Sequence, residues 1–265
     1  MRLDKLLVEQ KYFPSREKAQ ISIAQHLVKV NGEIINKCSK EIDETAMIEI
    51  IDLFNKYVSR GGLKLEKAIS EFSLNFNGKR ILDIGASTGG FTDCALQAGA
   101  EFIFAVDVGT AQLHPSLQKH PKVAFLENKD FRNLTLKETG NIPFDFIVSD
   151  VSFISLTYII PHLSPFLAEN GQLVLLIKPQ FEAGPSFLSK NGIVKDDKGL
   201  KISIQKIELE ALNHGYYLND LAISTLFEKN KNVEFLALLS RRNNHFTINF
   251  SKLFTDIKNI KKNLI

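Results

Sequence analysis

Residues 80–91 of the chain read Arg-Ile-Leu-Asp-Ile-Gly-Ala-Ser-Thr-Gly-Gly-Phe, a short apolar run followed by a glycine-rich turn. Ile81 and Leu82 are branched and apolar, which is typical of a parallel strand that is buried on both faces. From Phe91 onward the apolar spacing predicts a helix that ends at Gly99. Because a strand, a glycine turn and a helix gather backbone N–H groups at a helix N-terminus, the stretch predicts a site for the charged tail or phosphate of a cofactor.

The spacing of the glycines separates the possible cofactors. Gly85, Gly89 and Gly90 form the pattern G-x-x-x-G-G, whereas a nicotinamide-binding loop is expected to read G-x-G-x-x-G and a nucleotide triphosphate loop to end in G-K-[ST]. Asp83 precedes the first glycine by two residues. This arrangement resembles motif I of the S-adenosylmethionine (SAM) dependent methyltransferases, in which an acidic residue at the strand end faces the methionine moiety. A glycine turn that only packs a helix on a strand is the alternative.

Length and composition limit the number of domains and the class of protein. The 265 residues have room for one large domain and a small one, and a hydrophobic content of 44% is ordinary for a packed core. No apolar run approaches the roughly 18 residues of a membrane span, and charged residues replace a signal-peptide core, so we expect a cytoplasmic protein without a membrane partner. Cys38 and Cys94 have no His or Cys neighbours at ligand spacing, which argues against a disulfide framework or a zinc site.

The positive charge is concentrated near the start of the chain. Residues 2–40 hold eight basic and four acidic side chains, a net charge of +4, whereas the whole chain carries +3. The apolar spacing from Leu3 predicts a short helix, Ser15 can cap a second helix over 16–25, and residues 28–32 predict a strand that enters a tight turn. These elements form a small αα-β module.

This module resembles the S4 RNA-binding domain, which presents basic side chains to structured RNA from two helices and a small curled sheet. The resemblance is carried by Arg2-Leu3-Asp4-Lys5-Leu6-Leu7, by Ser15-Arg16, by Ala19 and by Val28-Lys29-Val30-Asn31-Gly32. It implies RNA binding by the basic residues Arg2, Lys5, Arg16, Lys18 and Lys29. Arg60, in the expected linker, is a further expected RNA-binding residue. Taken singly, Arg16 or Lys18 is no more than a charge on a solvated helix face.

From Lys79 onward apolar strands alternate with helical patterns, and this rhythm predicts a doubly wound parallel sheet. After the glycine loop the expected elements are strands over 101–107, 123–128, 144–149, 172–177, 216–224 and 233–240 and helices over 156–167, 199–213 and 251–265. The expected fold class is α/β, a SAM-dependent methyltransferase (Rossmann-like) sheet with a small N-terminal α+β S4 domain. We place the S4-like domain at 1–54, a linker at 55–60 and the methyltransferase domain at 61–265.

Acidic residues mark the ends of successive strands. In an open parallel sheet the ligand lies beyond the carboxyl ends of the strands, so Asp107 is placed to accept both ribose hydroxyls of a cofactor, and Asp130 to accept from an adenine amino group. Asp150 ends the fourth strand. With the glycine loop these residues indicate SAM as the cofactor. The expected SAM-binding residues are Asp83, Gly85, Ala86, Ser87, Gly89, Gly90, Phe91, Asp107, Asp130 and Asp150.

Residues 149–156 exclude two kinds of methyl transfer. An enzyme that resembles the adenine-N6 methyltransferases should show [DN]-P-P-[FY] at this strand end, but Asp150 is followed by Val151. A cytosine-C5 enzyme needs a cysteine nucleophile in the pocket, and Cys94 belongs to the helix after the glycine loop.

Two further residues complete a catalytic pattern. Lys178 ends a strand and Glu234 begins another, and with Lys64 and Asp150 they resemble the Lys-Asp-Lys-Glu tetrad of the FtsJ-type 2′-O-ribose methyltransferases. The resemblance implies catalytic roles for these four residues. Lys64 falls in the first turn of an expected helix, where a cation opposes the helix dipole.

The order of all these motifs resembles the hemolysin A (TlyA) family of rRNA cytidine-2′-O-methyltransferases over nearly its full length. The match includes the S4-like module and residues 57–65, 85–91, 149–156 and 178–182. The resemblance implies SAM-dependent 2′-O-methylation of cytidine in 23S rRNA, 16S rRNA or both. The implied partners are ribosomal RNA and a ribosomal subunit, and we expect a monomer that needs no metal ion.

The tetrad residue types suit the reaction. A ribose 2′-hydroxyl is a weak acid, and attack on the sulfonium methyl requires that it be oriented and lose its proton as the bond forms. Lys178, flanked by Asp150 and Glu234, is expected to grip the hydroxyl and stabilise the developing alkoxide. The proton acceptor stays open, because a neutral lysine needs a pKa below about 10.4 and two carboxylates act in the opposite direction. A structural ion-pair cluster is the alternative.

Two other functions remain as alternatives. The chain can be an S4-containing RNA-binding or ribosome-assembly factor whose methyltransferase fold is inactive, although the intact tetrad argues against this. A pore-forming hemolysin is the other alternative, and the lack of a long apolar segment argues against it.

Overall fold

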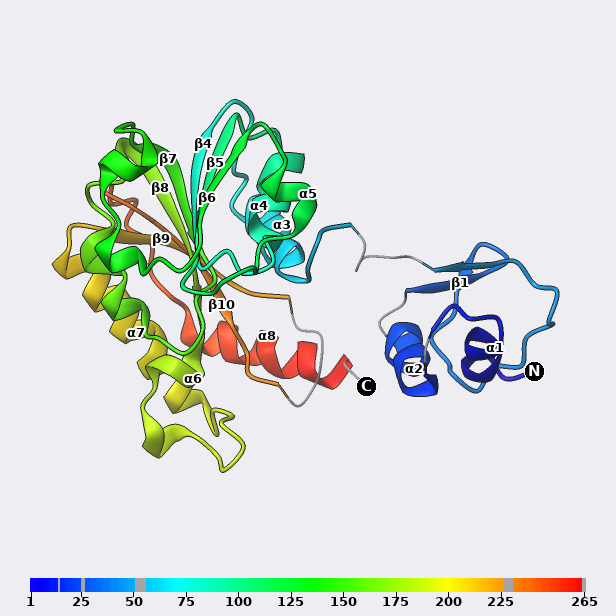
Figure 1. The fold of residues 1–265 in the computed structure, drawn as a ribbon. Helices are drawn as coiled ribbons and strands as arrows, with labels where there is room; N and C mark the ends of the chain where they lie inside the picture. The colour runs from blue at the N-terminus through cyan, green and yellow to red at the C-terminus, as the bar shows by residue number, and fades with distance from the viewer. Residues whose placement is uncertain (14, 25–26, 51–55, 226–230, 264–265) are drawn as a thin grey trace. The chain divides into compact units, whose positions relative to one another are not determined.

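The computed structural model describes residues 1–13, 15–24, 27–50, 56–225 and 231–263, which form two compact units. One unit contains the described residues up to position 56, and the other contains the described residues from 57 to 258 (Figure 1). Each unit has its own cluster of buried apolar side chains. No helix within the described ranges is long and apolar enough to span a bilayer.

The small unit has the two helices and the hairpin that the sequence predicts. Its elements are α1 (Leu3–Glu9), α2 (Arg16–Ala24), β1 (Val28–Val30), β2 (Glu33–Ile34) and β3 (Ile48–Ile50). Strand β1 lies between the other two strands and is antiparallel to both. Asn31 and Gly32, with φ angles of 52° and 83°, form the tight turn between β1 and β2. Leu3, Leu7 and Ile23 join the helices to the sheet in one core.

The large unit alternates strands and helices. Its elements in chain order are α3 (Gly61–Glu71), β4 (Arg80–Ile84), α4 (Gly90–Gln97), β5 (Phe102–Val106), α5 (Pro115–Gln118), β6 (Val123–Leu126), β7 (Phe144–Ser149), β8 (Leu167–Ile177), α6 (Pro179–Glu182), α7 (Asp197–Asn213), β9 (Tyr217–Ile223) and β10 (Phe235–Ser240), and α8 (Phe250–Asn263) follows. Short 3₁₀ turns connect them at Phe131–Asn133, Leu136–Thr139, Leu156–Tyr158, Ile160–His162 and Pro185–Phe187.

The seven strands form one sheet in the order β6-β5-β4-β7-β8-β10-β9. The first five are parallel, and β10 is antiparallel to both of its neighbours. The chain starts in the middle of the sheet at β4, moves outward to β6, and returns to β7 on the other side of β4. The sheet is therefore doubly wound as expected. Its antiparallel strand, β10, is the last strand of the chain.

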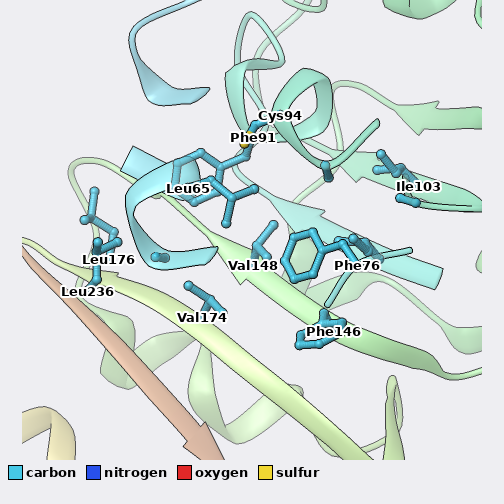
Figure 2. Packing of buried hydrophobic residues seen from close by; sticks show 14 of the residues in the cluster. Leu65, Phe76, Phe91, Cys94, Ile103, Phe146, Val148, Val174, Leu176 and Leu236 are labelled. Atoms are coloured by element: carbon cyan, nitrogen blue, oxygen red, sulfur yellow. The ribbon is translucent and has the colours of Figure 1, made fainter. Parts of the chain in front are cut away.

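Helices α3 and α4 cover one face of this sheet. Leu65 of α3 and Phe91 of α4 pack with Val148 and Val174 of the strands, as Figure 2 shows. The two helices begin very close to each other, because a Cβ on Gly90 would lie 2.3 Å from the Ser59 hydroxyl oxygen and 2.8 Å from the Gly62 nitrogen. This close approach fixes the first turns of α3, which carry Lys64.

The expected helix over 156–167 is wrong. The chain forms two 3₁₀ turns there, and β8 then begins at Leu167, five residues before the expected start of the strand. Pro161 and Pro165 account for the difference, because proline has no N–H for a helical hydrogen bond and disfavours helical geometry in the residue before it.

Candidate active site

The four tetrad side chains come from four different elements and meet at one edge of the sheet. Lys64 lies on α3, Asp150 directly follows β7, Lys178 directly follows β8 and Glu234 directly precedes β10. Phe235 pairs with Ile177 across the antiparallel strands β10 and β8, so Glu234 and Lys178 each stand one residue beyond that pair. The register of the sheet thus gathers charges that are far apart in the sequence.

Asp150 is the centre of the cluster. Lys64 Nζ lies 3.2 Å from Asp150 Oδ2, and Lys178 Nζ lies 2.6 Å from Asp150 Oδ1. Lys178 also donates a hydrogen bond of 2.6 Å to the Ser152 hydroxyl. All four tetrad side chains are largely enclosed, with exposed fractions between 8% and 19%.

One expected pairing differs from the structure. Lys178 was expected to lie between Asp150 and Glu234, but the Glu234 carboxylate lies 2.8 Å from Lys64 Nζ. The cluster is therefore a chain of contacts, from Glu234 through Lys64 and Asp150 to Lys178. Burial lowers the pKa of Lys64, but Asp150 and Glu234 outweigh burial and raise that pKa above its ordinary value. This raised pKa favours the ammonium form of Lys64 in the cluster.

A cavity of about 520 Å³ opens beside Asp150, beyond the carboxyl ends of β4, β5 and β7. Its lining includes five of the expected SAM-binding residues, Gly85, Ser87, Asp107, Asp130 and Asp150. It also includes Lys129, Phe131, Arg132, Ser152 and Phe153, which the sequence did not single out. Asp107, Asp130 and Asp150 therefore line one cavity, and Asp150 connects that cavity to the tetrad.

Asp107 and Asp130 already accept hydrogen bonds from other groups of the protein. Asp107 accepts hydrogen bonds of 2.7 Å from the backbone N–H groups of Ser87 and Gly109, one on each carboxylate oxygen. Each oxygen keeps a second lone pair for a hydroxyl donor. Asp130 accepts from the guanidinium of Arg132 at 2.5 Å, and this neighbour lowers the pKa of the Asp130 carboxyl. The expected adenine contact of Asp130 would have to share the carboxylate with Arg132.

Asp83 lies beneath the cavity and does not line it. Its side chain is 1% exposed, and Oδ2 accepts a hydrogen bond of 2.6 Å from the Thr92 hydroxyl. Oδ1 is buried and has no hydrogen-bond partner in the described part of the chain. Burial raises the pKa of Asp83 to about 7. A buried carboxylate oxygen without a donor is costly, which suits a residue that meets a cationic group of a ligand.

The remaining expected SAM-binding residues support the loop. Gly89, with a φ of 95°, is the N-cap of α4, and a Cβ there would lie 2.3 Å from Leu117 Cδ1. Ala86 is buried, and Phe91 is 3% exposed within the core shown in Figure 2. Gly90 serves the close contact between α3 and α4. These residues therefore shape the loop, and a role in direct cofactor contact stays a prediction.

Phe153 is a candidate that the sequence gave no reason to choose. It has a positive φ of 65°, which is rare for a bulky residue, and its side chain is 92% exposed. Its ring centroid lies 5.5 Å from that of Phe181 on α6. An exposed aromatic ring at a cavity rim can stack on a nucleobase. The backbone strain and the exposure that mark Phe153 are visible only in three dimensions.

In the small unit, two of the expected RNA-binding residues form ion pairs with the same aspartate. Asp4 is fully buried, and its carboxylate accepts from Arg2 at 3.1 Å, from Arg16 at 2.8 Å and from Gln20 at 2.6 Å. Arg2 contributes most to a pKa for Asp4 that is held far below its usual range. The sequence did not predict this cluster, although Asp4 belongs to the motif that carries the S4 resemblance.

The other expected RNA-binding residues are distributed differently. Lys5 pairs with Glu9 at 3.5 Å, and Lys29 pairs with Glu49 at 3.5 Å. Arg60 is exposed at the N-cap of α3, in the large unit. The side chain of Lys18 lies outside the described residues.

Comparison with known proteins finds a matching family model for each of the two units. The model of the FtsJ-like methyltransferase family matches residues 57–241, and the S4 domain model matches residues 1–48. Hemolysin A of Brachyspira hyodysenteriae is 42% identical over 243 residues, which cover 89% of this chain and 98% of that protein. The "16S/23S rRNA (cytidine-2'-O)-methyltransferase TlyA" of Mycobacterium tuberculosis is 35% identical over 239 residues, which cover 90% of this chain and 89% of that protein.

A solved structure agrees over the whole length. "Putative hemolysin from Streptococcus thermophilus" superposes with a TM-score of 0.76 at 38% identity and covers 99% of this chain and 98% of that one. The family matches confirm the expected fold class, a methyltransferase sheet with an N-terminal S4 domain. The chain therefore belongs to the FtsJ-like methyltransferase family, and to the group within it that carries an S4 domain and includes hemolysin A and TlyA.

Proposed function

We propose that this chain is a SAM-dependent methyltransferase that modifies the 2′-oxygen of cytidine in ribosomal RNA. The observation that carries the proposal is the enclosed chain of contacts from Glu234 through Lys64 and Asp150 to Lys178, which meets the cavity at Asp150. The TlyA relative, named for the same reaction on 16S and 23S rRNA, supports the choice of substrate.

We place the cofactor in the cavity beside Asp150. When bound, SAM supplies an electrophilic methyl group on a sulfonium centre. Asp107 binds the ribose hydroxyls through its free lone pairs, and Asp83 attracts the ammonium of the methionine moiety through its unpartnered oxygen. Gly85 and Ser87 line the same cavity and contact the cofactor through the loop.

The tetrad orients and activates the ribose hydroxyl. Lys178 would hold the 2′-oxygen, and in its ammonium form it would stabilise the negative charge that develops there as the hydroxyl loses its proton. Asp150 fixes the position of Lys178 through their 2.6 Å contact, and Lys64 with Glu234 fixes Asp150. The hydroxyl proton would pass to Lys178, to Asp150 or to solvent.

Two routes for the hydroxyl proton fit this geometry, one to Lys178 and the other to Asp150 or solvent, and a pH–rate profile separates them. If Lys178 enters the reaction neutral and takes the proton, the single-turnover rate rises with pH until that lysine has lost its proton. If Asp150 or a water molecule accepts the proton and Lys178 acts as an ammonium, the rate does not rise over the same alkaline range and falls where Lys178 loses its proton. The raised pKa of Lys64 disfavours this lysine as the acceptor.

The RNA is bound by both units. In this proposal Arg2, Arg16 and their basic neighbours in the S4-like domain contact phosphates, and Phe153 offers its exposed ring to the target base. The division into residues 1–54, a linker at 55–60 and residues 61–265 is part of the proposal, and Asn55 lies outside the described residues. We also propose a cytoplasmic monomer that acts on a ribosomal subunit without a metal ion.

Mass spectrometry of nucleosides from rRNA, with primer extension to map the position, tests the proposal. Cells that lack the gene should lose a 2′-O-methylcytidine, and the gene should restore it. The Lys178→Ala gene should not restore it. If rRNA methylation is identical in all these strains, the proposed function is wrong.

The hemolysin name of a close relative supplies one competing function. A pore-forming protein should release dye from liposomes when pure, and this measurement separates it from a methyltransferase. An inactive RNA-binding factor should bind rRNA but transfer no methyl group from labelled SAM. The enclosed tetrad favours the enzyme over both.

A further inference from the structure

Glu182 is a buried acidic residue that has no place in the tetrad. It ends α6, and its side chain is 1% exposed. The carboxylate accepts a hydrogen bond of 2.5 Å from the Ser155 hydroxyl and one of 2.8 Å from the Leu156 backbone N–H. Lys206 of α7, which is 40% exposed, lies 3.3 Å from the same carboxylate. Glu182 therefore ties α6 to the loop that follows Asp150.

Two more contacts join the same two segments. Lys178, the N-cap of α6, reaches the start of the loop at Asp150 and Ser152. One turn of helix later, the ring of Phe181 lies against that of Phe153. The loop and the helix thus run side by side with three successive links, and Glu182 makes the last one.

Stability alone does not explain this carboxylate. Transfer of a carboxylate out of water is unfavourable, and well-packed apolar side chains often stabilise such a position as well or better. Besides the Lys206 ammonium, the groups that Glu182 binds are a hydroxyl and a backbone N–H of the loop, so these two contacts fix where the loop lies. Between this anchor and Asp150 stand Ser152, which accepts from Lys178, and the exposed ring of Phe153.

We propose that Glu182 is a positioning residue for methyl transfer, which holds the 151–156 loop against α6 so that Ser152 and Phe153 meet the substrate in one geometry. This inference rests on the proposed function, because it assigns Glu182 to the same active site. A misplacement of about 1 Å at a reacting centre can cost about 100-fold in rate. Loss of the anchor should therefore appear in the chemical step and leave SAM binding unchanged.

The activity test compares two variants of Glu182 in the full-length protein. Glu182→Gln keeps a carbonyl oxygen for the Leu156 N–H and an amide that can donate to the Ser155 hydroxyl. Glu182→Ala removes both links. We expect Glu182→Ala to lower the single-turnover rate at saturating rRNA and SAM at least tenfold, and Glu182→Gln to stay within about threefold of wild type. Glu101→Ala, an exposed glutamate at the opposite end of the sheet, is the matched control and should leave the rate unchanged.

A spectroscopic test follows the loop without any activity measurement. The chain has no tryptophan, so Phe153→Trp introduces a single reporter. In that background Glu182→Ala should lower the fluorescence anisotropy of the tryptophan, and Glu182→Gln should preserve it. Ser155→Ala, which removes one of the two links, should give an intermediate value and serves if Glu182→Ala does not fold.

The outcomes separate the two proposals. If wild-type protein does not methylate rRNA, the proposed function fails, and the anisotropy still decides whether Glu182 holds the loop. If wild type is active while Glu182→Ala, or Ser155→Ala in its place, matches wild type in both rate and anisotropy, the positioning role is wrong. Equal losses of rate in Glu182→Ala and Glu182→Gln would also overturn it, because the glutamine retains both links.

Discussion

Each unit of this protein uses one aspartate to hold two cations, but the two units expose those cations differently. Around Asp4, the side chains of Arg2 and Arg16 are 47% and 54% exposed, although the carboxylate itself is fully buried. Around Asp150, the side chains of Lys64 and Lys178 are only 15% and 8% exposed. The small unit directs its positive charge toward solvent, and the large unit encloses it.

In the proposed function, this difference in exposure corresponds to a division between RNA binding and chemistry. Exposed guanidinium groups interact with phosphates in a medium of high dielectric constant, so they contribute affinity that salt screens. Enclosed ammonium groups interact with a developing negative charge where water is excluded, and the same charge then has a much larger effect. The carboxylate in each cluster mainly fixes the cations in place.

The largest expected effect is at Lys178. Lys178→Ala should lower the single-turnover rate about 100- to 10,000-fold, the range for a positioned acid–base group, while SAM affinity and folding stay nearly intact. Lys178→Arg should restore little, because the guanidinium is planar and bulkier and cannot act as a neutral base. Rapid-quench methyl transfer with labelled SAM measures both. A rate for Lys178→Ala within a few fold of wild type would show that the tetrad assignment is mistaken.

Asp107 should have the next largest effect, on binding only. Asp107→Ala removes a charged acceptor for the ribose hydroxyls and should weaken SAM binding by about 1–3 kcal/mol. Isothermal titration calorimetry measures this change, and Glu101→Ala is the control. An unchanged SAM affinity would remove Asp107 from the cofactor site.

The pKa of Asp83, raised to about 7 by burial, gives a pH-dependent prediction. An ammonium group of SAM favours the carboxylate, so SAM affinity should fall below pH 7 by up to about tenfold per pH unit. Without ligand, the pH dependence of folding stability has the opposite sign to that of SAM affinity. The folded state binds the Asp83 proton more tightly than the unfolded state, so this stabilisation is complete at low pH and is lost as pH rises through 7.

Calorimetric titrations between pH 5.5 and 8 test the effect on binding, with Asp83→Asn as the comparison. The asparagine variant should bind SAM more weakly at pH 8 and should lose the pH dependence. Affinity that is equally pH-dependent in both proteins would assign the titration to another group.

The smallest expected effect is at Arg16. Arg16→Ala should reduce the slope of log binding constant against log salt concentration for rRNA by about 0.7 to 0.9, the contribution of one phosphate contact. Filter-binding or fluorescence titrations over a range of salt measure the slope. Lys119→Ala, an exposed lysine of the large unit, is the matched control. An unchanged slope for Arg16→Ala would show that Arg16 does not contact phosphate.

The parts of this fold that follow local rules were predictable. The apolar run before Gly85 and the glycine turn locate β4 and α4 within a residue or two, because strand burial and helix spacing leave a periodic pattern. The prediction of a helix over 156–167 is wrong because Pro161 and Pro165 prevent a continuous helix in spite of the apolar spacing. The position of β10 between β8 and β9 depends on strand pairing between distant segments, which no local pattern records.

For the site too, the placement that follows from the sheet was predictable, and the contacts between side chains were not. Asp150 and Lys178 share a place because the carboxyl ends of parallel strands meet at one edge of a sheet. The choice of partner for each charge was not predictable, since it depends on side-chain directions, and Glu234 in fact contacts Lys64. Glu182 belongs to the matched stretch 178–182, but the sequence did not predict its contacts, because its burial comes from a helix and a loop that the fold brings together.

One measurement tests the division between the two clusters most directly. Single-turnover methyl transfer to rRNA is followed at saturating SAM over a range of RNA concentrations, for Arg16→Ala and Lys178→Ala in parallel. We expect Arg16→Ala to require more RNA for half-maximal rate but to reach the wild-type maximum, and Lys178→Ala to keep the half-maximal concentration but lose the maximum. A reduced maximum for Arg16→Ala, or a wild-type maximum for Lys178→Ala, would contradict the assignment of binding to the exposed cluster and chemistry to the enclosed one.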